Sequence, residues 1–439
     1  MIGARAVRTA RLLALPLGAL ALSLEGGLRR LSGAEPEAVR RSLRARNAER
    51  TRRTLADLKG GALKAGQLLS TVEMLFPQDP EQTWRETLTG LQEHGTPVPF
   101  TTVASVLRED LGPQWRSNFR FLNQEPVAAA SIGQVHRGTW HDGRDVAVKV
   151  QYPNIREAIT TDLVTLSAMS RLAALVARGL AMPPLIRELR VRLSEELDYE
   201  HEAAAQRRFA AAYADDNTVV IPDVVAAAPR VLVSDWLPGT PIAQLAQHAP
   251  KAERDVAGLL YQRFVLGGPT RARLLHSDPH PGNFRITPDG RLGVLDFGST
   301  LEMPEGMPTT FGRLISVLMR GNEADILRGL RDEGFLAPGR TVDARKLADY
   351  LAPFTEPARH EVFHFTREWL RAEFGRVNDP RNPDFAVALQ LSMPAEHLFT
   401  HRVWLGCIGV LCQLDATVRI GPELRRYLPG FTGADPSGG

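Results

Sequence analysis

The pattern of apolar and polar positions divides the chain into three stretches. Residues 1–95 are predicted to form helices rich in arginine, alanine and leucine, which end at a turn-forming loop of residues 95–99. Residues 96–236 mix short strands with helices, and residues 237–439 are mainly helical. We therefore predict an α+β fold with a helical N-terminal extension, a smaller mixed lobe and a larger helical lobe.

The mixed stretch begins with a predicted short helix over residues 103–111. The pattern then shifts to strand, turn and strand between residues 119 and 151, with Asp142-Gly143 at the turn, which is typical of a hairpin. The elements predicted after this hairpin are two long helices over 154–179 and 184–212 and two short strands over 219–225 and 230–236.

The last stretch is predicted to be helical as far as Leu428, apart from residues 274–299, where polar residues interrupt strand-like runs. Both cysteines, Cys407 and Cys412, lie in one apolar run that is predicted to be a buried helix over residues 403–414. On one helix they point to different faces, so we expect buried, unreactive thiols rather than a disulfide. The low cysteine count fits a reducing compartment.

Composition narrows the class of protein. The 439 residues are 44% hydrophobic and 23% charged, which excludes disordered, collagen-like and disulfide-rich classes. Lysine and arginine total 53 against 50 acidic residues, a formal charge of +3. Nucleic acid is therefore not an expected partner.

Four separated motifs carry the candidate chemistry. The first fits the phosphate-covering template G-x-G-x-x-G-x-V, with alanine at the first two glycine places. Its candidate nucleotide-contacting residues are Ala128, Ala129, Ala130, Ser131, Gly133 and Val135. Small side chains let backbone N–H groups approach phosphate oxygens, and alanine should make the loop stiffer than glycine would. Taken alone, an alanine-rich run is also common in ordinary packing.

The second motif, Val146-Ala147-Val148-Lys149, places one ammonium group on an otherwise apolar strand, as expected of a lysine that binds the α- and β-phosphates. A buried lysine needs an anionic partner. Glu202, from the following helix, is our candidate for that partner. The other acids of residues 196–202 are rivals, and each of them also suits a solvated helix face.

The third motif runs from His276 to Asn283, where Asn283 follows Asp278 at the five-residue offset of a kinase catalytic loop. Asp278 would orient or deprotonate the attacking hydroxyl or water, and Asn283 would supply a neutral oxygen to a metal. Two prolines and a glycine exclude a helix in this segment. His276 and His280 are therefore not the i, i+4 zinc pair of a helical motif, and we expect structural hydrogen bonds for both.

The fourth motif is Leu295-Asp296-Phe297-Gly298, whose aspartate would hold Mg²⁺ against the β- and γ-phosphates. One carboxylate, one amide oxygen and a triphosphate satisfy the preference of Mg²⁺ for hard oxygen ligands. The four motifs stand in the order of a protein kinase. The sequence thus predicts binding of ATP or ADP with Mg²⁺, with Lys149 and Asp278 as catalytic residues.

With these motifs in place, the chain resembles the UbiB or aarF-domain family of atypical kinases over roughly residues 55–300. The resemblance also rests on Lys64 and Gln67, which fit a K-x-G-Q motif, and on Glu196 and Asp198, which fit an E-x-D motif. The alanine-rich loop and the D-P-H-P-G-N form of the catalytic segment match the family, while Ser277 stands where alanine is more usual.

The resemblance implies an atypical protein-kinase-like two-lobe fold whose N-terminal extension covers the cleft. Lys64 and Gln67 would reach towards Glu196, Asp198 and the nucleotide. It also implies ATPase or small-molecule kinase activity in support of isoprenoid quinone synthesis, with isoprenoid lipids and quinone-biosynthesis enzymes as partners. The expected domains are the extension, the N-lobe and the C-lobe, over residues 1–95, 96–236 and 237–439.

Contact with a membrane is left open by the sequence. No run reaches the roughly 18 apolar residues of a spanning helix, and the nearest, residues 12–24, lacks a signal-peptide cleavage site. Family members often end in spanning helices, so membrane contact would fall to the basic N-terminal helices or to a partner. The arginines of residues 40–53 suit either a solvated face or anionic lipid headgroups. We expect a cytoplasmic protein, with peripheral contact to the inner face of the membrane as an open alternative.

Three functions are compatible with these motifs. The first is a catalyst that transfers a phosphoryl group from ATP to water or a small acceptor. The second is a nucleotide-gated scaffold with negligible turnover, which the intact catalytic set disfavours. The third is a conventional small-molecule kinase, acting for example on an aminoglycoside or choline, which the K-x-G-Q motif and the alanine-rich loop disfavour.

Overall fold

The computed structural model describes residues 97–129, 132–157, 159–160, 197–336, 342–378, 382, 387, 390–391 and 394–432. The helices predicted over residues 1–95 lie outside this part of the chain, as do residues 161–196 of the two long helices predicted further on. The chain divides into two compact units. The first takes in the described residues up to Tyr199 together with Ala226–Val233, and the second takes in Glu200–Val225 and the residues from Ser234 onward.

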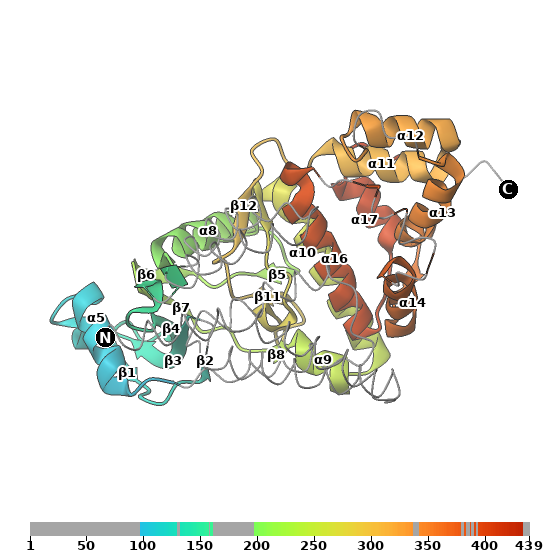
Figure 1. Cartoon of the computed structure of the whole chain (residues 1–439). Coiled ribbons are helices and arrows are strands. Elements are labelled where there is room, and N and C mark those ends of the chain that lie inside the picture. Colours follow the sequence, from blue (N-terminus) through green and yellow to red (C-terminus); the bar gives the residue numbers. More distant parts are fainter. Residues whose placement is uncertain are drawn as a thin grey trace, which may run out of the picture. The chain divides into compact units, whose positions relative to one another are not determined.

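The first unit is built on a β-sheet with the strand order β1-β3-β4-β7-β6, in which β2 also pairs with β3 (Figure 1). Its strands are β1 (Phe119–Leu122), β2 (Ala128–Ala129), β3 (Gly133–Trp140), β4 (Asp145–Gln151), β6 (Val224–Ala228) and β7 (Val231–Asp235). Gly143, in the turn between β3 and β4, has φ of 101°, which favours glycine. The hairpin predicted around Asp142-Gly143 is confirmed.

Strand β4 gives this sheet two different faces. Its valines are fully buried on one face, whereas Lys149 falls on the other face and is half-buried. Helix α5 (Phe100–Leu111) packs against β4. This helix confirms the one predicted over residues 103–111 and begins three residues earlier, directly after Pro99. Proline suits the position before a helix because it has no backbone N–H, so it is tolerated at the start of a helix and disfavoured in its interior.

The single strand predicted over residues 219–225 is wrong, because the structure breaks it in two. Strand β5 (Val219–Val220) pairs in parallel with β11 (Leu292–Val294), while β6 begins at Val224 and joins the sheet of the first unit. Pro222 lies between them and has no backbone N–H to donate to a sheet. The strand predicted over residues 230–236 is confirmed as β7.

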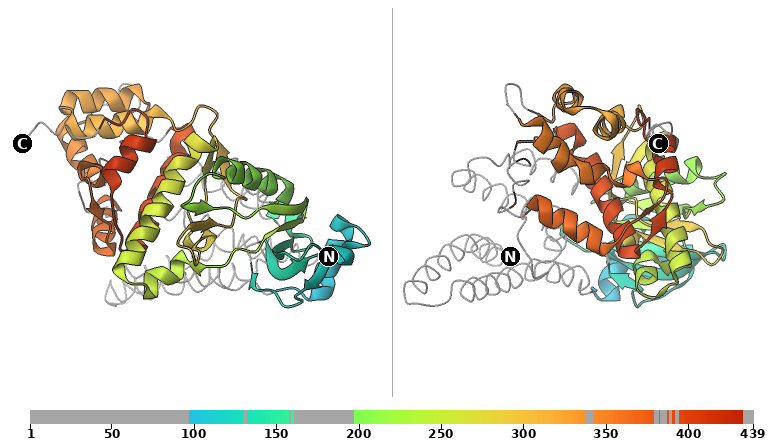
Figure 2. Two further views of the ribbon diagram at one scale, coloured as in Figure 1. Left: turned by 180° about the vertical axis from the view of Figure 1, so that it is seen from behind. Right: turned by 90° about the vertical axis from the view of Figure 1, so that its right-hand side faces the viewer.

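The second unit is mainly helical (Figure 2), and its described residues carry three small sheets. One has the order β5-β11-β10-β8, the second pairs β12 with β9, and the third pairs β13 with β14. The additional strands are β8 (Thr240–Pro241), β9 (Leu274–His276), β10 (Phe284–Ile286), β12 (Thr300–Glu302), β13 (Phe363–His364) and β14 (Thr417–Val418). Its helices are α8 (Tyr199–Ala212), α9 (Ile242–His248), α10 (Lys251–Arg271), α11 (Thr309–Arg320), α12 (Glu323–Asp332), α13 (Ala344–Thr355), α14 (Arg367–Asn378), α16 (Leu398–Leu414) and α17 (Ile420–Tyr427).

Helices α10 and α16 lie side by side at the centre of the second unit (Figure 1). Gly258 lets α10 pass close to its neighbours, because a Cβ there would lie 2.8 Å from the Cβ of Ala416. Helix α16 contains both cysteines, which are free and buried, and burial raises the pKa of each thiol to about 12. The prediction of one buried helix with unreactive thiols is confirmed.

A second, smaller core lies where α11, α12 and α13 pack against one another. It is built from apolar side chains that recur at helical spacing, among them Leu314, Ile326, Leu330 and Leu347. None of the helices in the described part of the chain is both long and apolar enough to cross a membrane.

Candidate nucleotide site

Two loops of the second unit carry the catalytic and metal-binding candidates, and two strand pairs hold them together. The loop of residues 277–283 runs from β9 to β10, and the loop of residues 295–299 runs from β11 to β12. Since β9 pairs with β12 and β10 pairs with β11, both loops are fastened at both ends. The Leu295 N–H also donates to the Asn283 carbonyl oxygen at 2.9 Å.

The serine beside the catalytic candidate adds a further link between the loops. The Ser277 N–H donates to the Ser299 carbonyl oxygen at 3.0 Å, and the two hydroxyl oxygens lie 2.7 Å apart. Ser277 is buried. Alanine, the more usual residue in the resemblance, would keep the backbone bond and lose the hydroxyl bond.

Asp278 and Asn283 are brought together by this loop. The Asn283 Nδ2 donates to the Asp278 Oδ2 at 2.9 Å, and both side chains are half-buried. The short helical turn of Pro281–Asn283 places the amide, and no α-helix forms here, as predicted. Because the amide nitrogen faces Asp278, the amide oxygen of Asn283 is the atom that would meet a metal.

His276 fixes the backbone of the neighbouring loop. Its Nε2 lies 2.6 Å from the Asp296 carbonyl oxygen, and since a carbonyl only accepts, Nε2 carries the proton. The ring is fully buried among four phenylalanine rings, with centroid distances of 5.3 to 6.4 Å. Burial lowers the pKa of His276, which favours the neutral ring. The Nδ1 of His280 accepts from the Gly282 N–H at 3.1 Å, so the predicted hydrogen-bonding role of each histidine is confirmed.

The segment Asp296-Phe297-Gly298 is held by one hydrogen bond within itself and by two contacts with α8. The Asp296 Oδ1 accepts from the Gly298 N–H at 3.1 Å. Phe297 is fully buried against Phe209 of α8, with ring centroids 5.2 Å apart. Glu202, also on α8 and buried, accepts weakly from the Phe297 N–H through Oε1 at 3.4 Å. The contact between Glu202 and Phe297 was missed by the sequence reasoning.

The donor set of this loop pair suits Mg²⁺ on chemical grounds. Asp296 contributes a carboxylate and Asn283 an amide oxygen, which are hard ligands of the kind that Mg²⁺ takes together with water and phosphate oxygens. The Nε2 of His276 is engaged with the Asp296 carbonyl oxygen, and the Nδ1 of His280 is engaged with the Gly282 N–H. The two residues predicted to hold Mg²⁺ therefore fit that ion.

The first unit positions its candidates through backbone register. Lys149 on β4 lies opposite Val135 on β3. Gly133, which begins β3, has no room for a side chain, because a Cβ there would lie 2.2 Å from the Val150 carbonyl oxygen. Ala128 and Ala129 form β2, pair with Val135 and Gln134, and are exposed. Ala128 and Ala129 thus form a short strand that precedes β3 and pairs with it antiparallel.

Only some of the other predicted site residues lie in the described part of the chain. Asp198 is half-buried and belongs to the first unit, whereas Glu202 belongs to the second. The pairing predicted for Lys149 and Glu202 spans the two units and stays a prediction. The candidates that lie outside the described residues are Lys64, Gln67, Ala130, Ser131 and Glu196.

Sequence reasoning also missed a buried polar chain at the start of β3. The Gln134 amide donates to the Val98 carbonyl oxygen and accepts from the Val98 N–H, and it lies 2.9 Å from the His136 Nε2. The His136 Nδ1 in turn lies 2.8 Å from the Asn123 carbonyl oxygen. These bonds tie the segment before α5 to the sheet next to the alanine-rich hairpin. A glutamine and a histidine two positions apart on a strand gave no distinctive signal.

A family model described as the ABC1 atypical kinase-like domain matches residues 90–329. The chain belongs to this family. The match covers every motif of the two loops and of the β3–β4 hairpin, and it confirms the resemblance found in the sequence.

Individual ABC1 relatives agree with the family match. The chain is 28% identical over 389 residues to the mitochondrial atypical kinase coq-8 of Caenorhabditis elegans, covering 85% of this chain and 50% of the relative. It is 31% identical over 331 residues to the mitochondrial atypical kinase COQ8B of Rattus norvegicus, covering 73% and 61%. The chain thus spans about half to three fifths of the length of these relatives.

A solved structure supports the fold. The Mycobacterium tuberculosis protein Rv3197, determined in complex with erythromycin, is 38% identical to this chain and superposes with a TM-score of 0.70. The match covers 91% of this chain and all of the Rv3197 chain. The predicted α+β, protein-kinase-like fold is confirmed.

Proposed function

We propose that this ABC1-family chain is a Mg²⁺-dependent atypical kinase or ATPase that transfers the γ-phosphoryl group of ATP to water or to a small acceptor. The observation that carries the proposal is the 2.9 Å hydrogen bond from Asn283 Nδ2 to Asp278 Oδ2. It pairs the candidate base with the candidate metal ligand in one rigid loop. A nucleotide-binding protein without turnover would not need a carboxylate oriented in this way.

In this proposal Asp278 orients the acceptor hydroxyl or water and takes its proton, with its Oδ2 held by Asn283 and its other oxygen turned to the acceptor. Asn283 and Asp296 would hold Mg²⁺, which would supply positive charge to neutralise the phosphates. Lys149, supported by Glu202, neutralises the α- and β-phosphates, and the alanine-rich hairpin covers them. Catalysis comes mainly from positioning and charge stabilisation.

The remaining motif residues are assigned a regulatory role. Lys64 and Gln67 would contact Glu196, Asp198 and the nucleotide, and so keep peptide substrates out of the site. A small organic molecule is the proposed acceptor, which the erythromycin complex of Rv3197 supports as a ligand class. By analogy with the COQ8 relatives, the activity would serve isoprenoid quinone or other lipid metabolism at a membrane surface.

The test is phosphate release from Mg·ATP by purified protein and by its Asp278→Asn variant. Loss of the base should reduce turnover about 100- to 10,000-fold, while nucleotide affinity stays nearly the same, because Asp278 is not assigned to bind the nucleotide. Asp332→Asn, the same chemical change at an exposed position of α12, is the matched control. Anionic liposomes and a phenolic quinone-precursor analogue are added in separate arms to test lipid dependence.

Each result has a distinct meaning. Turnover that falls in Asp278→Asn and not in Asp332→Asn supports the assigned base. Phosphate release that is above the protein-free background and equal in all three proteins would remove Asp278 from the mechanism. Tight nucleotide binding with wild-type release no faster than the protein-free background would favour the nucleotide-gated scaffold.

A further inference from the structure

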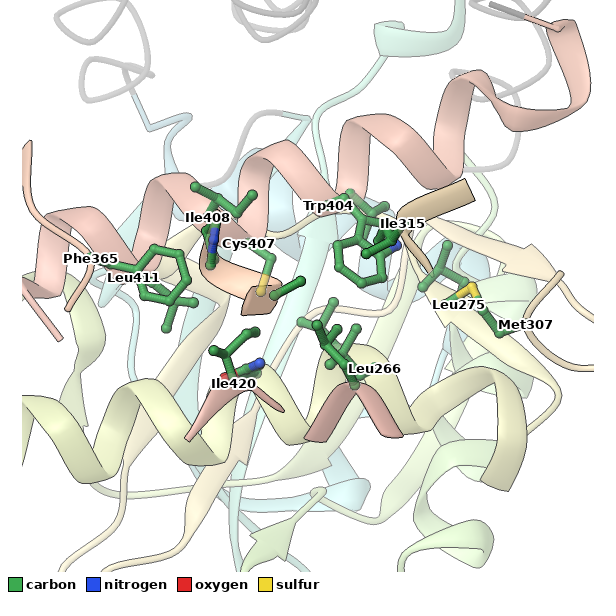
Figure 3. Close-up of a pocket in the computed structure, with 16 residues that line it drawn as sticks. Leu266, Leu275, Met307, Ile315, Phe365, Trp404, Cys407, Ile408, Leu411 and Ile420 are labelled. Carbon is green, nitrogen blue, oxygen red and sulfur yellow. The ribbon is translucent and has the colours of Figure 1, made fainter. Parts of the chain in front are cut away.

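An apolar cavity lies inside the second unit, between α10, α16 and α17 (Figure 3). Its volume is about 70 Å³. Side chains of α16, among them Trp404, Cys407 and Leu411, point towards Leu266 of α10 and Ile420 of α17 (Figure 3). The cavity is roughly five times larger than the about 10–15 Å³ that one water molecule needs.

One polar side chain breaks this apolar lining. Gln262 of α10 lines the cavity and is 1% exposed, and neither atom of its amide has a hydrogen-bond partner among the described residues. The indole N–H of Trp404, which also lines the cavity, is equally without a partner in that part of the chain. Buried polar groups are nearly always hydrogen-bonded, so an occupant of the cavity would supply the partners that these groups lack.

Another buried glutamine shows the ordinary arrangement. Gln206 of α8 is also 1% exposed, and its Nε2 donates to the Pro222 carbonyl oxygen at 2.7 Å. The same residue type at the same depth is therefore satisfied in one place and unsatisfied in the other. Gln262 lines the cavity, and Gln206 does not.

The lining defines the chemistry of the occupant. The Gln262 amide offers a donor and an acceptor, and the Trp404 indole offers a second donor. A hydroxyl group both accepts and donates, so one oxygen can bond to the Gln262 amide, and an apolar chain then fills the remaining volume. A charged ligand is excluded, because no charged side chain lines the cavity and an unpaired buried charge is very unfavourable.

We infer that this cavity binds the hydroxyl-bearing end of an aliphatic alcohol, with the hydroxyl on Gln262. The site is separate from the nucleotide loops but adjoins them. Leu275 lines the cavity immediately before His276. Gly406, next to Cys407, packs so tightly on Pro279 that a Cβ there would lie 2.3 Å from the proline Cγ. An occupant thus touches Leu275, which lies directly before the loop that holds Asp278, and Cys407, whose neighbour Gly406 packs on that loop.

The experiment titrates butan-1-ol into the full-length protein and follows binding by saturation-transfer NMR, which needs no enzymatic activity. Wild type should show saturable transfer to the alkyl protons. Gln262→Met keeps the length of the side chain and removes its hydrogen-bonding atoms, so the dissociation constant should rise about tenfold. Gln206→Met, the matched control, should bind butan-1-ol as wild type does.

Thermal unfolding of the same two variants gives an independent readout. Gln262→Met should raise the midpoint in the absence of alcohol, because it removes an unsatisfied amide. Gln206→Met should lower it, because it breaks the bond to Pro222. A lowered midpoint in both variants would overturn the view that Gln262 lacks a partner.

A second experiment fills the cavity with a substitution that leaves Gln262 unchanged. Ala358 lines the cavity, and Ala358→Leu should fill it and abolish saturation transfer. Absence of saturable transfer in wild type would overturn the proposal, as would equal affinity in wild type and Gln262→Met. If one variant does not fold, the wild-type titration and the other variant still decide.

Discussion

The two units hold their candidate nucleotide-binding residues by different means. In the first unit, Lys149 and Val135 are partners on adjacent strands, and the backbone register of the β3–β4 hairpin sets their positions. In the second unit, Asp278 and Asp296 lie on loops whose ends are fixed by strand pairs, and within these loops side chains such as Asn283 and His276 add further hydrogen bonds. The first arrangement should therefore fail only when the backbone is disturbed, whereas the second should fail when one side chain loses its hydrogen bond.

The largest effect is expected from Gly133→Ala in the first unit. The new Cβ would lie 2.2 Å from the Val150 carbonyl oxygen, so β3 and β4 must move apart. We expect the free energy of unfolding to fall by about 3 kcal/mol, measured by urea denaturation. Gly409→Ala on α16 is the control, because no described atom lies within 4 Å of its Cβ position, and it should raise the free energy by about 0.5–1 kcal/mol. Equal free energies of unfolding for Gly133→Ala and wild type would show that β3 and β4 can move apart at little cost.

An intermediate effect is expected from His276→Phe in the second unit. The ring still fills the space among the phenylalanines, but the Asp296 carbonyl loses its donor. The free energy of unfolding should fall by about 2 kcal/mol, and turnover should fall with it because Asp296 is less well held. His280→Phe, at an exposed position, should change both quantities much less. Unchanged turnover in His276→Phe would show that the backbone alone places Asp296.

The same variant has a pH signature. Burial lowers the pKa of His276 from 6.5, so below that pH the unfolded chain takes up a proton that the folded protein does not. Its contribution to stability is therefore fully present above about pH 6.5 and is lost as the pH falls through the folded-state pKa. In His276→Phe the decline of the denaturation midpoint on the acid side should be shallower than in wild type. An identical decline in both proteins would contradict this assignment.

The smallest effect is expected from Ser277→Ala. The bond between the Ser277 and Ser299 hydroxyls is lost, while the backbone bond between the same residues remains. The expected change is about 1 kcal/mol, measured by urea denaturation. The double variant Ser277→Ala with Ser299→Ala should lie within a few tenths of a kcal/mol of the single one, because the second hydroxyl has already lost its partner. A fully additive loss would mean that the two hydroxyls act independently.

Local patterns in the sequence were enough to predict the hairpin, helix α5 and the spacing of the loop motifs. Asp142-Gly143 determines its own turn, and the five-residue offset of Asp278 and Asn283 lets one loop bring them together. The break at Pro222 could have been predicted by the same local rule, since proline cannot donate within a sheet. The prediction of a single strand over the seven residues 219–225 gave Pro222 too little weight.

Contacts between segments that are far apart in the sequence could not be predicted from local patterns. The acids near Glu202 could be recognised as candidates, but the contact with Phe297 depends on how α8 packs against a loop almost a hundred positions away. Gln262 likewise lies in an ordinary helical pattern, and only the packing of α10 against α16 and α17 leaves its amide without a partner.

The path of the chain between the two units limits how this protein can be taken apart or recombined. The chain passes from one unit to the other after Tyr199, after Val225 and after Val233. A fragment that began at Trp236 would keep Asp278 and Asp296 but lose α8 and β5, which belong to the same unit. Neither unit is a continuous module, so exchange of either one between relatives by a single crossover would produce a hybrid with both cores incomplete.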